Sequence, residues 1–563
     1  MSDTIIQEVP VSSTSAASTE HINHSIELIS QTNLKQTTLS TFLKRPVSVV
    51  REKKINDLIF NMIVKDLQPF SVVEDTGFKE LINYLEPGYK LPSRYTFSNT
   101  FLDAQYLEVQ SRLKEELQSA NFVSITTDAW TSRAATSHQA VTAHYILNWE
   151  LKYALLGCFE CHERHTAEYI KKELCNLLSH WNLQNKIFVC VTDNAANMKA
   201  AIRLANFEHL PCVAHTLNLI VRAGLQGAEL DCLIKKIKTI VEHFHRSPLA
   251  TKKFAEVQKQ LRPGEKPLKL KMDIVTRWNS TLDMLERMCI LQEPLEAALG
   301  LLHNPVANLS ESDWQALPDV IKILRPFKQL TEEMSSENKV TVSMVLAATE
   351  SVISMFENLN LNINTEIGKN LSNKIITEFK YRFKNCYRNP ILSKAALLDP
   401  RFKKLAFRLA DESNYECAKT LLKTELEKYF NVDKQQTVQS NKVTPAIFTD
   451  TNEDSIWKDF DARVTSNSVS NSTVSSIVTM RQYFEERILS RNECPLKWWQ
   501  ARALLYPELS ILAEKYLSIM ATSGPSERTF SKSGQIQSEK RCSIQPKRME
   551  KVLFLNMNKR LLR

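Results

Sequence analysis

The stretch Asn121–Trp130 reads NFVSITTDAW, and apolar residues alternate along it with small polar residues. This alternation predicts a half-buried β-strand, in which successive side chains point to opposite faces. Asp128 falls at the end of the strand, so its carboxylate is expected to sit on a rigid sheet and to face solvent. Such a carboxylate suits a metal ligand, although an aspartate that caps the following turn fits the same pattern.

A second run, KIFVCVTD at Lys186–Asp193, is also short, apolar and closed by an acid. The pattern between the two runs predicts two strands and one amphipathic helix, at 138–147, 151–161 and 166–181. Tight turns favour an antiparallel meander of the first three strands, and the helix favours a fourth strand parallel to the first. This is the ribonuclease H-like arrangement, in which the first and fourth strands are neighbours. Asp128 and Asp193 are therefore expected side by side.

Two carboxylates do not hold two metal ions, so a third acid is expected from a helix farther along the chain. The best candidate is Glu527 in ATSGPSERTFSKSG, where Ser523–Ser526 is typical of a loop that enters a helix. The alternative is an ordinary glutamate in a first turn, stabilised by the helix dipole. Spacing alone does not choose Glu527 among the 63 acids of the chain.

The length of 563 residues predicts about three domains. The net charge of +9 is compatible with binding to nucleic acid but does not require it. We expect a soluble intracellular protein with no membrane partner, because the sequence has neither a long apolar run nor a secretory signal. The 11 cysteines lack regular spacing and are expected as free thiols.

One group of residues imitates a zinc site: Cys158, Cys161, His162 and His165. Both cysteines fall on a predicted strand, so we expect no zinc in this chain.

The sequence divides into five segments by composition and periodicity. These are a disordered tail (1–45), a helical N-terminal domain (46–120), the first part of an α/β core (121–222), an all-helical insertion with flexible loops near 433–476 (223–493), and a C-terminal region that completes the core (494–563).

Six motifs in order resemble those of the hAT superfamily of DNA transposases and of the zinc-finger BED-containing proteins derived from them. They are TTDAWTS (126–132), HTAEYI (165–170), VTDNAANM (191–198), CVAHTLNL (212–219), TRWNST (276–281) and LAEKYLSIMATSGPSERTFSKSG (512–534). The resemblance extends from about Leu39 to Leu562. It implies a ribonuclease H-like catalytic core interrupted by a large helical insertion domain, followed by a hAT dimerisation region.

The resemblance also implies roles for individual residues. Asp128, Asp193 and Glu527 match the acidic triad of the family, which binds two Mg²⁺ or Mn²⁺ ions for phosphoryl transfer on DNA. Trp278 matches a tryptophan that stacks on a flipped base, and Arg277 beside it is a candidate DNA contact.

Three further residues lie in the same motifs. Cys212 and His215 match a pair near the active site, although a core cysteine and a packed histidine fit the pattern as well. Arg528 either contacts a DNA phosphate or pairs with an acid.

The resemblance implies DNA as a partner, location in the nucleus, and a homodimer or larger assembly formed through the C-terminal region. Apolar residues between Trp498 and Ile519 are more numerous than one segment can bury. No BED-type CxxC with a paired HxxxH precedes Asp128. Two explanations stay open: the sequence is a truncated or mispredicted copy, or DNA specificity comes from the insertion domain or from a partner such as a finger-bearing relative. Two functions stay open: a transposase that still cuts DNA, and a catalytically silent DNA-binding and dimerisation protein in transcription regulation.

Overall fold

The computed structural model describes residues 46–131, 136–274, 278–303, 305–407, 412–440, 472–536 and 544–562. The expected tail at 1–45 lies outside these ranges, as does Arg277. Internal contacts divide the chain into two units, one with residues up to Ile63 and Gln68–Asn99, the other with Val64–Leu67 and the chain from Thr100 onward. No helix among the described residues has the length and hydropathy needed to cross a membrane.

The N-terminal unit is helical, as expected for this part of the chain. It contains most of α2 (Val49–Lys65), the short helix η2 (Phe70–Glu74), α3 (Thr76–Leu85) and α4 (Arg94–Thr96). The Tyr89 hydroxyl donates a hydrogen bond to Asn56 of α2. The helix α5 (Leu102–Ser119) groups with the second unit, where it packs on α23 (Pro546–Met557).

A mixed five-stranded sheet is the centre of the second unit, with the order β3-β2-β1-β4-β5. The strands are β1 (Val123–Thr131), β2 (Ser137–Leu147), β3 (Glu150–Cys161), β4 (Ile187–Thr192) and β5 (Glu208–Pro211). β1 pairs with β2 and β2 with β3 in antiparallel fashion, whereas β1 with β4 and β4 with β5 are parallel. The predicted meander, crossover helix and parallel strand are therefore confirmed; β5 was not predicted.

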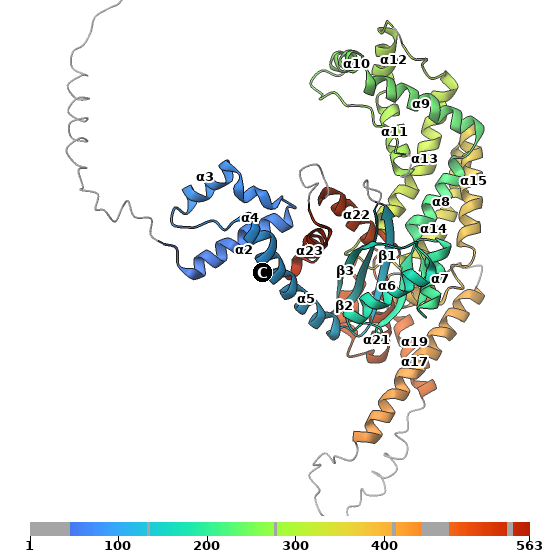
Figure 1. Cartoon of the computed structure of the whole chain (residues 1–563). Helices are drawn as coiled ribbons and strands as arrows, with labels where there is room; N and C mark the ends of the chain where they lie inside the picture. The colour runs from blue at the N-terminus through green and yellow to red at the C-terminus, as the bar shows by residue number, and fades with distance from the viewer. Residues whose placement is uncertain are drawn as a thin grey trace, which may run out of the picture. The chain divides into compact units, whose positions relative to one another are not determined.

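Helices from the N-terminal and from the C-terminal part of the second unit's sequence pack around this sheet (Figure 1). The crossover helix α6 (Ala167–His180) packs on α7 (Ala196–Leu204), which follows β4. From the C-terminal region, α21 (Pro507–Leu517) contacts β2, α22 (Gly524–Ile536) contacts β1 and β2, and α23 contacts β3. The segment after residue 494 thus completes the core around the sheet.

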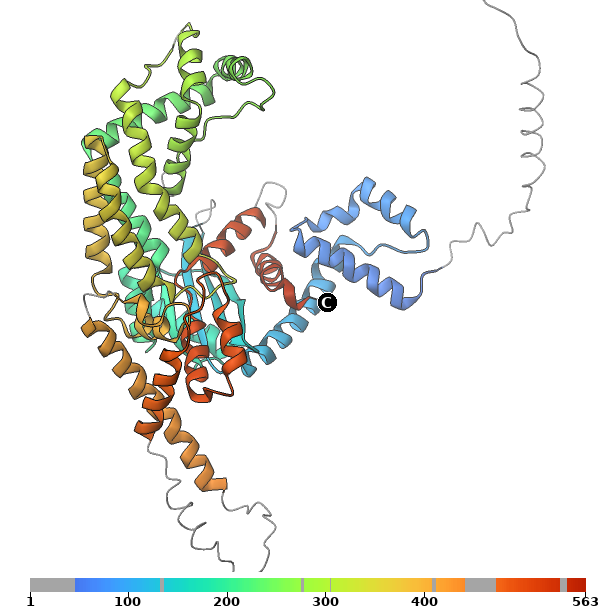
Figure 2. The ribbon, with the colours of Figure 1, turned by 180° about the vertical axis from the view of Figure 1, so that it is seen from behind.

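The region between β5 and α21 is helical in its described parts, as predicted. Its helices are α8 (Val213–Leu225), α9 (Ala228–Arg246), α10 (Pro248–Leu261), α11 (Trp278–Ile290), α12 (Gln292–Gly300), α13 (Glu311–Met334), α14 (Met344–Leu359), α15 (Glu366–Phe383), α16 (Pro390–Leu398), α17 (Glu412–Ser440), α19 (Ser472–Glu485) and α20 (Pro495–Arg502). Helices α9 to α12 lie at the end of this region away from the sheet, as both views show (Figures 1 and 2).

Residues 433–440 were expected in a flexible loop, and the structure places them in α17. This expectation was wrong because no glycine or proline interrupts residues 412–440, so nothing ends the helix. Residues 472–476 of the same expected loop belong to α19. Residues 441–471 lie outside the described part of the chain.

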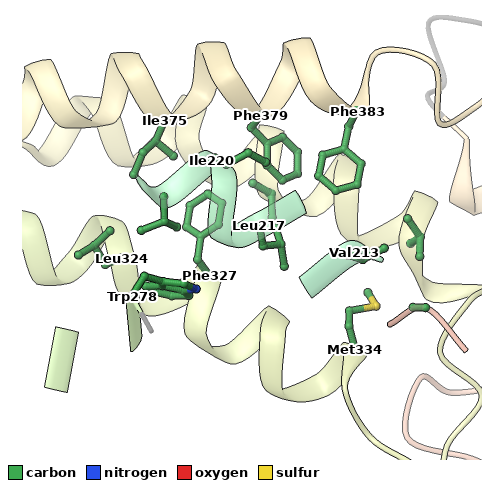
Figure 3. Close-up of a cluster of buried hydrophobic side chains, with 14 of the residues drawn as sticks. Val213, Leu217, Ile220, Trp278, Leu324, Phe327, Met334, Ile375, Phe379 and Phe383 are labelled. Atoms are coloured by element: carbon green, nitrogen blue, oxygen red, sulfur yellow. The ribbon is translucent and has the colours of Figure 1, made fainter. Parts of the chain in front are cut away.

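The helical insertion shares a continuous apolar core with the sheet. Aromatic and aliphatic side chains of α8, α13 and α15 interdigitate there, including Leu217, Phe327 and Phe379 (Figure 3). Gly224 of α8 allows this close packing, since a Cβ atom at that position would lie 2.3 Å from Cγ1 of Ile375. The insertion is therefore fixed directly to the sheet unit by α8.

A buried carboxylate also joins the insertion to the C-terminal region. Glu425 of α17, only 12% exposed, lies 2.5 Å from Lys394 of α16 and 2.7 Å from Lys515 of α21. The Tyr516 hydroxyl donates to the same carboxylate at 2.6 Å. Burial alone would raise the pKa of Glu425, but these hydrogen bonds lower it to about 2.

Candidate active site

Two side chains of β1, four residues apart, contact the C-terminal helix α22. The Thr126 Oγ1 lies 2.8 Å from the Ser526 Oγ, and the Trp130 ring stacks on Phe530 with centroids 3.9 Å apart. Asp128 lies between Thr126 and Trp130 in the strand, so its side chain points to the same face. The hydrogen bond at Thr126 and the ring stacking at Trp130 therefore hold the start of α22 on either side of Asp128.

Asp193 follows the end of β4, the parallel neighbour of β1. The last paired positions of the two strands are Thr126 and Val191, and each acid comes two residues later. Parallel neighbours are about 4.8 Å apart, so the register places the two acids next to each other at one edge of the sheet. The Asp193 Oδ1 also accepts a hydrogen bond of 3.2 Å from the backbone N–H of Ala195.

The electrostatics of Asp128 show that the third acid is nearby. Burial, the negative charge of Glu527 and, to a smaller extent, that of Asp193 raise the pKa of Asp128 from 3.8 to about 7. A hydrogen bond of 2.8 Å from the Ala129 N–H to the Asp128 Oδ1 opposes this rise. Glu527 and Asp193 therefore both lie near enough to Asp128 for their charges to raise its pKa.

Carboxylates in this arrangement fit divalent cations. Oxygen donors are those that Mg²⁺ and Mn²⁺ prefer, and a cation among them would offset the repulsion that raises the pKa of Asp128. Within the described ranges, however, no three His, Cys, Asp or Glu side chains are already arranged to enclose a metal ion. Glu527 is exposed on the first turn of α22, so its side chain has room to turn toward the two aspartates.

Cys212 lies beside the loop that leads into α22. It is fully buried, and its Sγ accepts hydrogen bonds from the backbone N–H groups of His215 (3.4 Å) and Ser523 (3.3 Å). The Val213 N–H donates to the Ala521 carbonyl at 2.9 Å. Burial raises the pKa of the Cys212 thiol, so the group is a neutral packing residue that caps α8 and holds this loop.

Trp278 is the first residue of α11 and is only 5% exposed. Its indole lies among the apolar side chains of the insertion, near Leu324 and Phe327 (Figure 3). Stacking of this ring on a DNA base stays a prediction, and it requires the ring to leave this core.

Arg528 pairs with the insertion. Its Nη1 lies 2.5 Å from the Glu337 Oε1, and its Nη2 donates to the Ser335 carbonyl. Of the two alternatives that the sequence left open, pairing with an acid is the one present in this conformation.

Three family models match the chain in the order of its elements. The ZBED1 RNase-like domain matches residues 126–211, the ZBED1 RNase-like helical domain matches 210–323, and the hAT family C-terminal dimerisation region matches 479–558. These three segments of the chain are similar to the ZBED1 RNase-like domains and to the hAT C-terminal dimerisation region. The first of these matches begins at the strand that bears Asp128, and the last includes Glu527.

Curated relatives are similar to this chain over most of its length. Zinc finger BED domain-containing protein 4 of Homo sapiens is 27% identical over 528 residues, which cover 90% of this chain and 43% of the human protein. The "Putative AC transposase" of Zea mays is 25% identical over 84% of this chain and 61% of its own length. Zinc finger BED domain-containing protein 6 of Mus musculus is 24% identical over 90% of this chain and 55% of its own length. The chain thus spans about half the length of these relatives.

The core around the sheet contains a buried polar network that the sequence analysis missed. Thr126 lies 2.6 Å from Thr142 of β2, whose Oγ1 lies 2.9 Å from the His144 Nε2. Burial, together with the positive charge of Arg528, lowers the pKa of His144 to about 3, so this histidine is neutral. The available signal was the presence of small polar residues in a buried strand, because such groups require partners. One partner of Thr126, Ser526, lies 400 residues away in the chain. Nothing in the sequence near Thr126 indicates that the two residues meet.

Proposed function

We propose that this chain is a hAT transposase-like DNA-binding protein that cleaves and transfers DNA strands at Asp128, Asp193 and Glu527. The observation that supports this most strongly is the pKa of about 7 at Asp128, which burial and the neighbouring acids cause. Negative charges held close together lower the stability of the folded protein, and such groups of charges are typical of functional sites. The strand order and pairing support a ribonuclease H-like core around the three acids.

The roles of the residues follow from their positions. Asp128 and Asp193 are oxygen ligands on two rigid strands, and Glu527 is a ligand on the first turn of α22. When bound, two Mg²⁺ or Mn²⁺ ions would activate a water or 3′-hydroxyl and stabilise the leaving oxygen. Asp128 must release its proton to become a full ligand, so activity is expected to rise as the pH increases through about 7.

The proposed partners are DNA in the nucleus, a second copy of the chain and a finger-bearing relative. Support for self-association comes from Leu504 and Leu505, which are 100% and 62% exposed between α20 and α21 within the matched dimerisation region. The two helices that flank them are anchored by buried residues such as Trp499 and Leu509, so the leucines project from a rigid base.

The direct test is nicking of supercoiled plasmid in Mn²⁺ by the purified chain and by its Asp128→Asn variant. We expect nicking by the wild type and a loss of at least about 100-fold in the variant, since a metal ligand is removed. An Asp66→Asn variant changes an exposed aspartate away from the site and serves as the control. Equal nicking by the wild type and Asp128→Asn would contradict the proposal.

A second function has support of its own: a catalytically silent DNA-binding and dimerisation protein that acts in transcription regulation. Among the described residues, the three acids do not form a group that could already hold a metal ion. In addition, Trp278 is buried. One relative, 27% identical over 321 residues, is named "Putative transcriptional regulator tpeD" of Talaromyces stipitatus. This alternative predicts DNA binding with the same affinity in wild type and Asp128→Asn, and no nicking by either even with cognate DNA ends and a finger-bearing partner.

A further inference from the structure

The start of α22 is contacted by the segment that joins two helices of the insertion. This segment, residues 335–343, is called here the α13–α14 link. Its Thr341 Oγ1 accepts a hydrogen bond of 3.0 Å from the Ala521 N–H, just before α22. Its Ser335 carbonyl and Glu337 carboxylate bind the Arg528 guanidinium. The insertion and the third acid are therefore in direct contact through one short stretch of chain.

The pair formed by Arg528 and Glu337 differs from an ordinary surface ion pair. The Glu337 side chain is 17% exposed and that of Arg528 is 40% exposed, with 2.5 Å between the charged atoms. Exposed pairs contribute little because water screens them, whereas a partly buried acid needs its partner. Loss of the Arg528 charge would leave the Glu337 carboxylate poorly solvated against α22.

Arg528 directly follows Glu527, and successive residues of an α-helix are about 100° apart around its axis. A contact that fixes the direction of Arg528 therefore also fixes the direction of Glu527. On the opposite side, Thr126 and Trp130 of the sheet hold Ser526 and Phe530. The rotation of α22 is thus set jointly by the sheet and by the α13–α14 link.

The two helices that the link joins have room to move. A cavity of about 330 Å³ lies between α13 and α14, and Met334 and Met344, at the two ends of the link, line it. Methionine side chains adapt to changes in shape, and a cavity removes contacts that would hold the helices in one position. A shift of α13 relative to α14 would reach α22 through Glu337.

We propose that Glu337 and Arg528 form a positioning pair that orients Glu527 toward Asp128 and Asp193, so that the insertion controls the third metal ligand. The inference rests on the proposed function, because it assigns a purpose to the orientation of Glu527. Neither residue touches the reacting atoms; both act through α22.

The test measures Mn²⁺ binding by isothermal titration calorimetry, alongside the Mn²⁺ concentration needed for half-maximal nicking. Variants are Glu337→Gln, the charge exchange Glu337→Arg with Arg528→Glu, and Glu333→Gln as a control. Glu333 forms another glutamate–arginine pair in the same region, 3.2 Å from Arg491. We expect Glu337→Gln to weaken Mn²⁺ binding by about tenfold, as changes to residues that orient metal ligands do.

The charge exchange is expected to restore most of the binding, and Glu333→Gln to leave it unchanged. A Glu337→Gln variant that melts at a lower temperature but binds Mn²⁺ as the wild type does would overturn the inference while the proposed function stands. A charge exchange that folds but binds no better than Glu337→Gln would also overturn it. If the wild type binds no Mn²⁺, the proposed function fails, and this inference fails with it.

Discussion

Replacing Asp128 with asparagine is expected to stabilise the protein at alkaline pH in the absence of metal. The pKa of this carboxyl group is raised from 3.8 to about 7 by burial and by the charges of Glu527 and Asp193. Between these pH values the folded state binds more protons than the unfolded state, so the free energy of unfolding falls as the pH rises and is lowest above about pH 7. The amide has no charge to lose, and its oxygen can still accept the hydrogen bond from Ala129.

The size of the effect follows from the same pKa. The pKa of Asp128 is about three units higher in the folded state than in the unfolded state, which corresponds to about 4 kcal/mol of unfolding free energy. Solvent beside the half-buried carboxylate screens part of this, so we expect the variant to exceed the wild type by about 2 to 4 kcal/mol above pH 7. At pH 4 the two proteins should differ little, because Asp128 is then protonated in the folded wild type.

Urea unfolding followed by tryptophan fluorescence in EDTA, at pH 4 and pH 8.5, measures this difference. Asp66→Asn is again the control and should show no pH-dependent gain. Added Mn²⁺ should narrow the difference, since a ligand at 100 times its dissociation constant stabilises the folded wild type by about 2.7 kcal/mol. Identical pH dependence of the wild type and Asp128→Asn would refute the convergence of the three acids.

Three other changes test separate parts of the structure. Trp130→Ala removes the stacking on Phe530 and should lower the unfolding free energy by about 2 kcal/mol, with little loss in Trp130→Phe; thermal denaturation checks this, and an unchanged melting temperature in the alanine variant contradicts it. Leu504→Asp combined with Leu505→Asp should convert a dimer to a monomer in light scattering without loss of stability, because both side chains are exposed; a dimer that persists would place the interface elsewhere. Glu425→Gln should cost about 3 kcal/mol at pH 7, since the pKa of Glu425 is lowered from 4.5 to about 2 despite its burial, by hydrogen bonds from two lysines and a tyrosine. The stabilisation by Glu425 is present above pH 4.5 and is lost as the pH falls toward 2, so the difference between Glu425→Gln and wild type in acid titrations should vanish there; a constant difference would argue against it.

The sequence was sufficient to predict the sheet, because its signals are local. Alternation in β1 and β2, a turn at Asn148 and Trp149, and an amphipathic crossover helix each occupy fewer than about 20 residues. Both turn residues have positive φ angles, as a tight hairpin requires. The neighbouring positions of Asp128 and Asp193 follow from this topology alone.

The contacts of the third acid could not be predicted in the same way. Nothing in the local sequence indicates that Ser526 meets Thr126 or that Arg528 meets Glu337, since both pairs depend on how distant helices pack. Trp278 shows a different limit: the resemblance implied a ring that stacks on a flipped base, and the burial of this ring in the apolar core of the insertion depends on distant helices.

The contact of β1 with α22 has a consequence for synthesis of the protein on the ribosome. β1 is made early, but Ser526 and Phe530 follow it by about 400 residues, and contacts of such long range form late. Until α22 has emerged, the polar and aromatic face of β1 has no partner from the C-terminal region. A nascent or prematurely terminated chain therefore has two of the three acids and lacks the helix that bears the third. A protein that cuts DNA would in this way stay inactive until nearly its whole length had been translated.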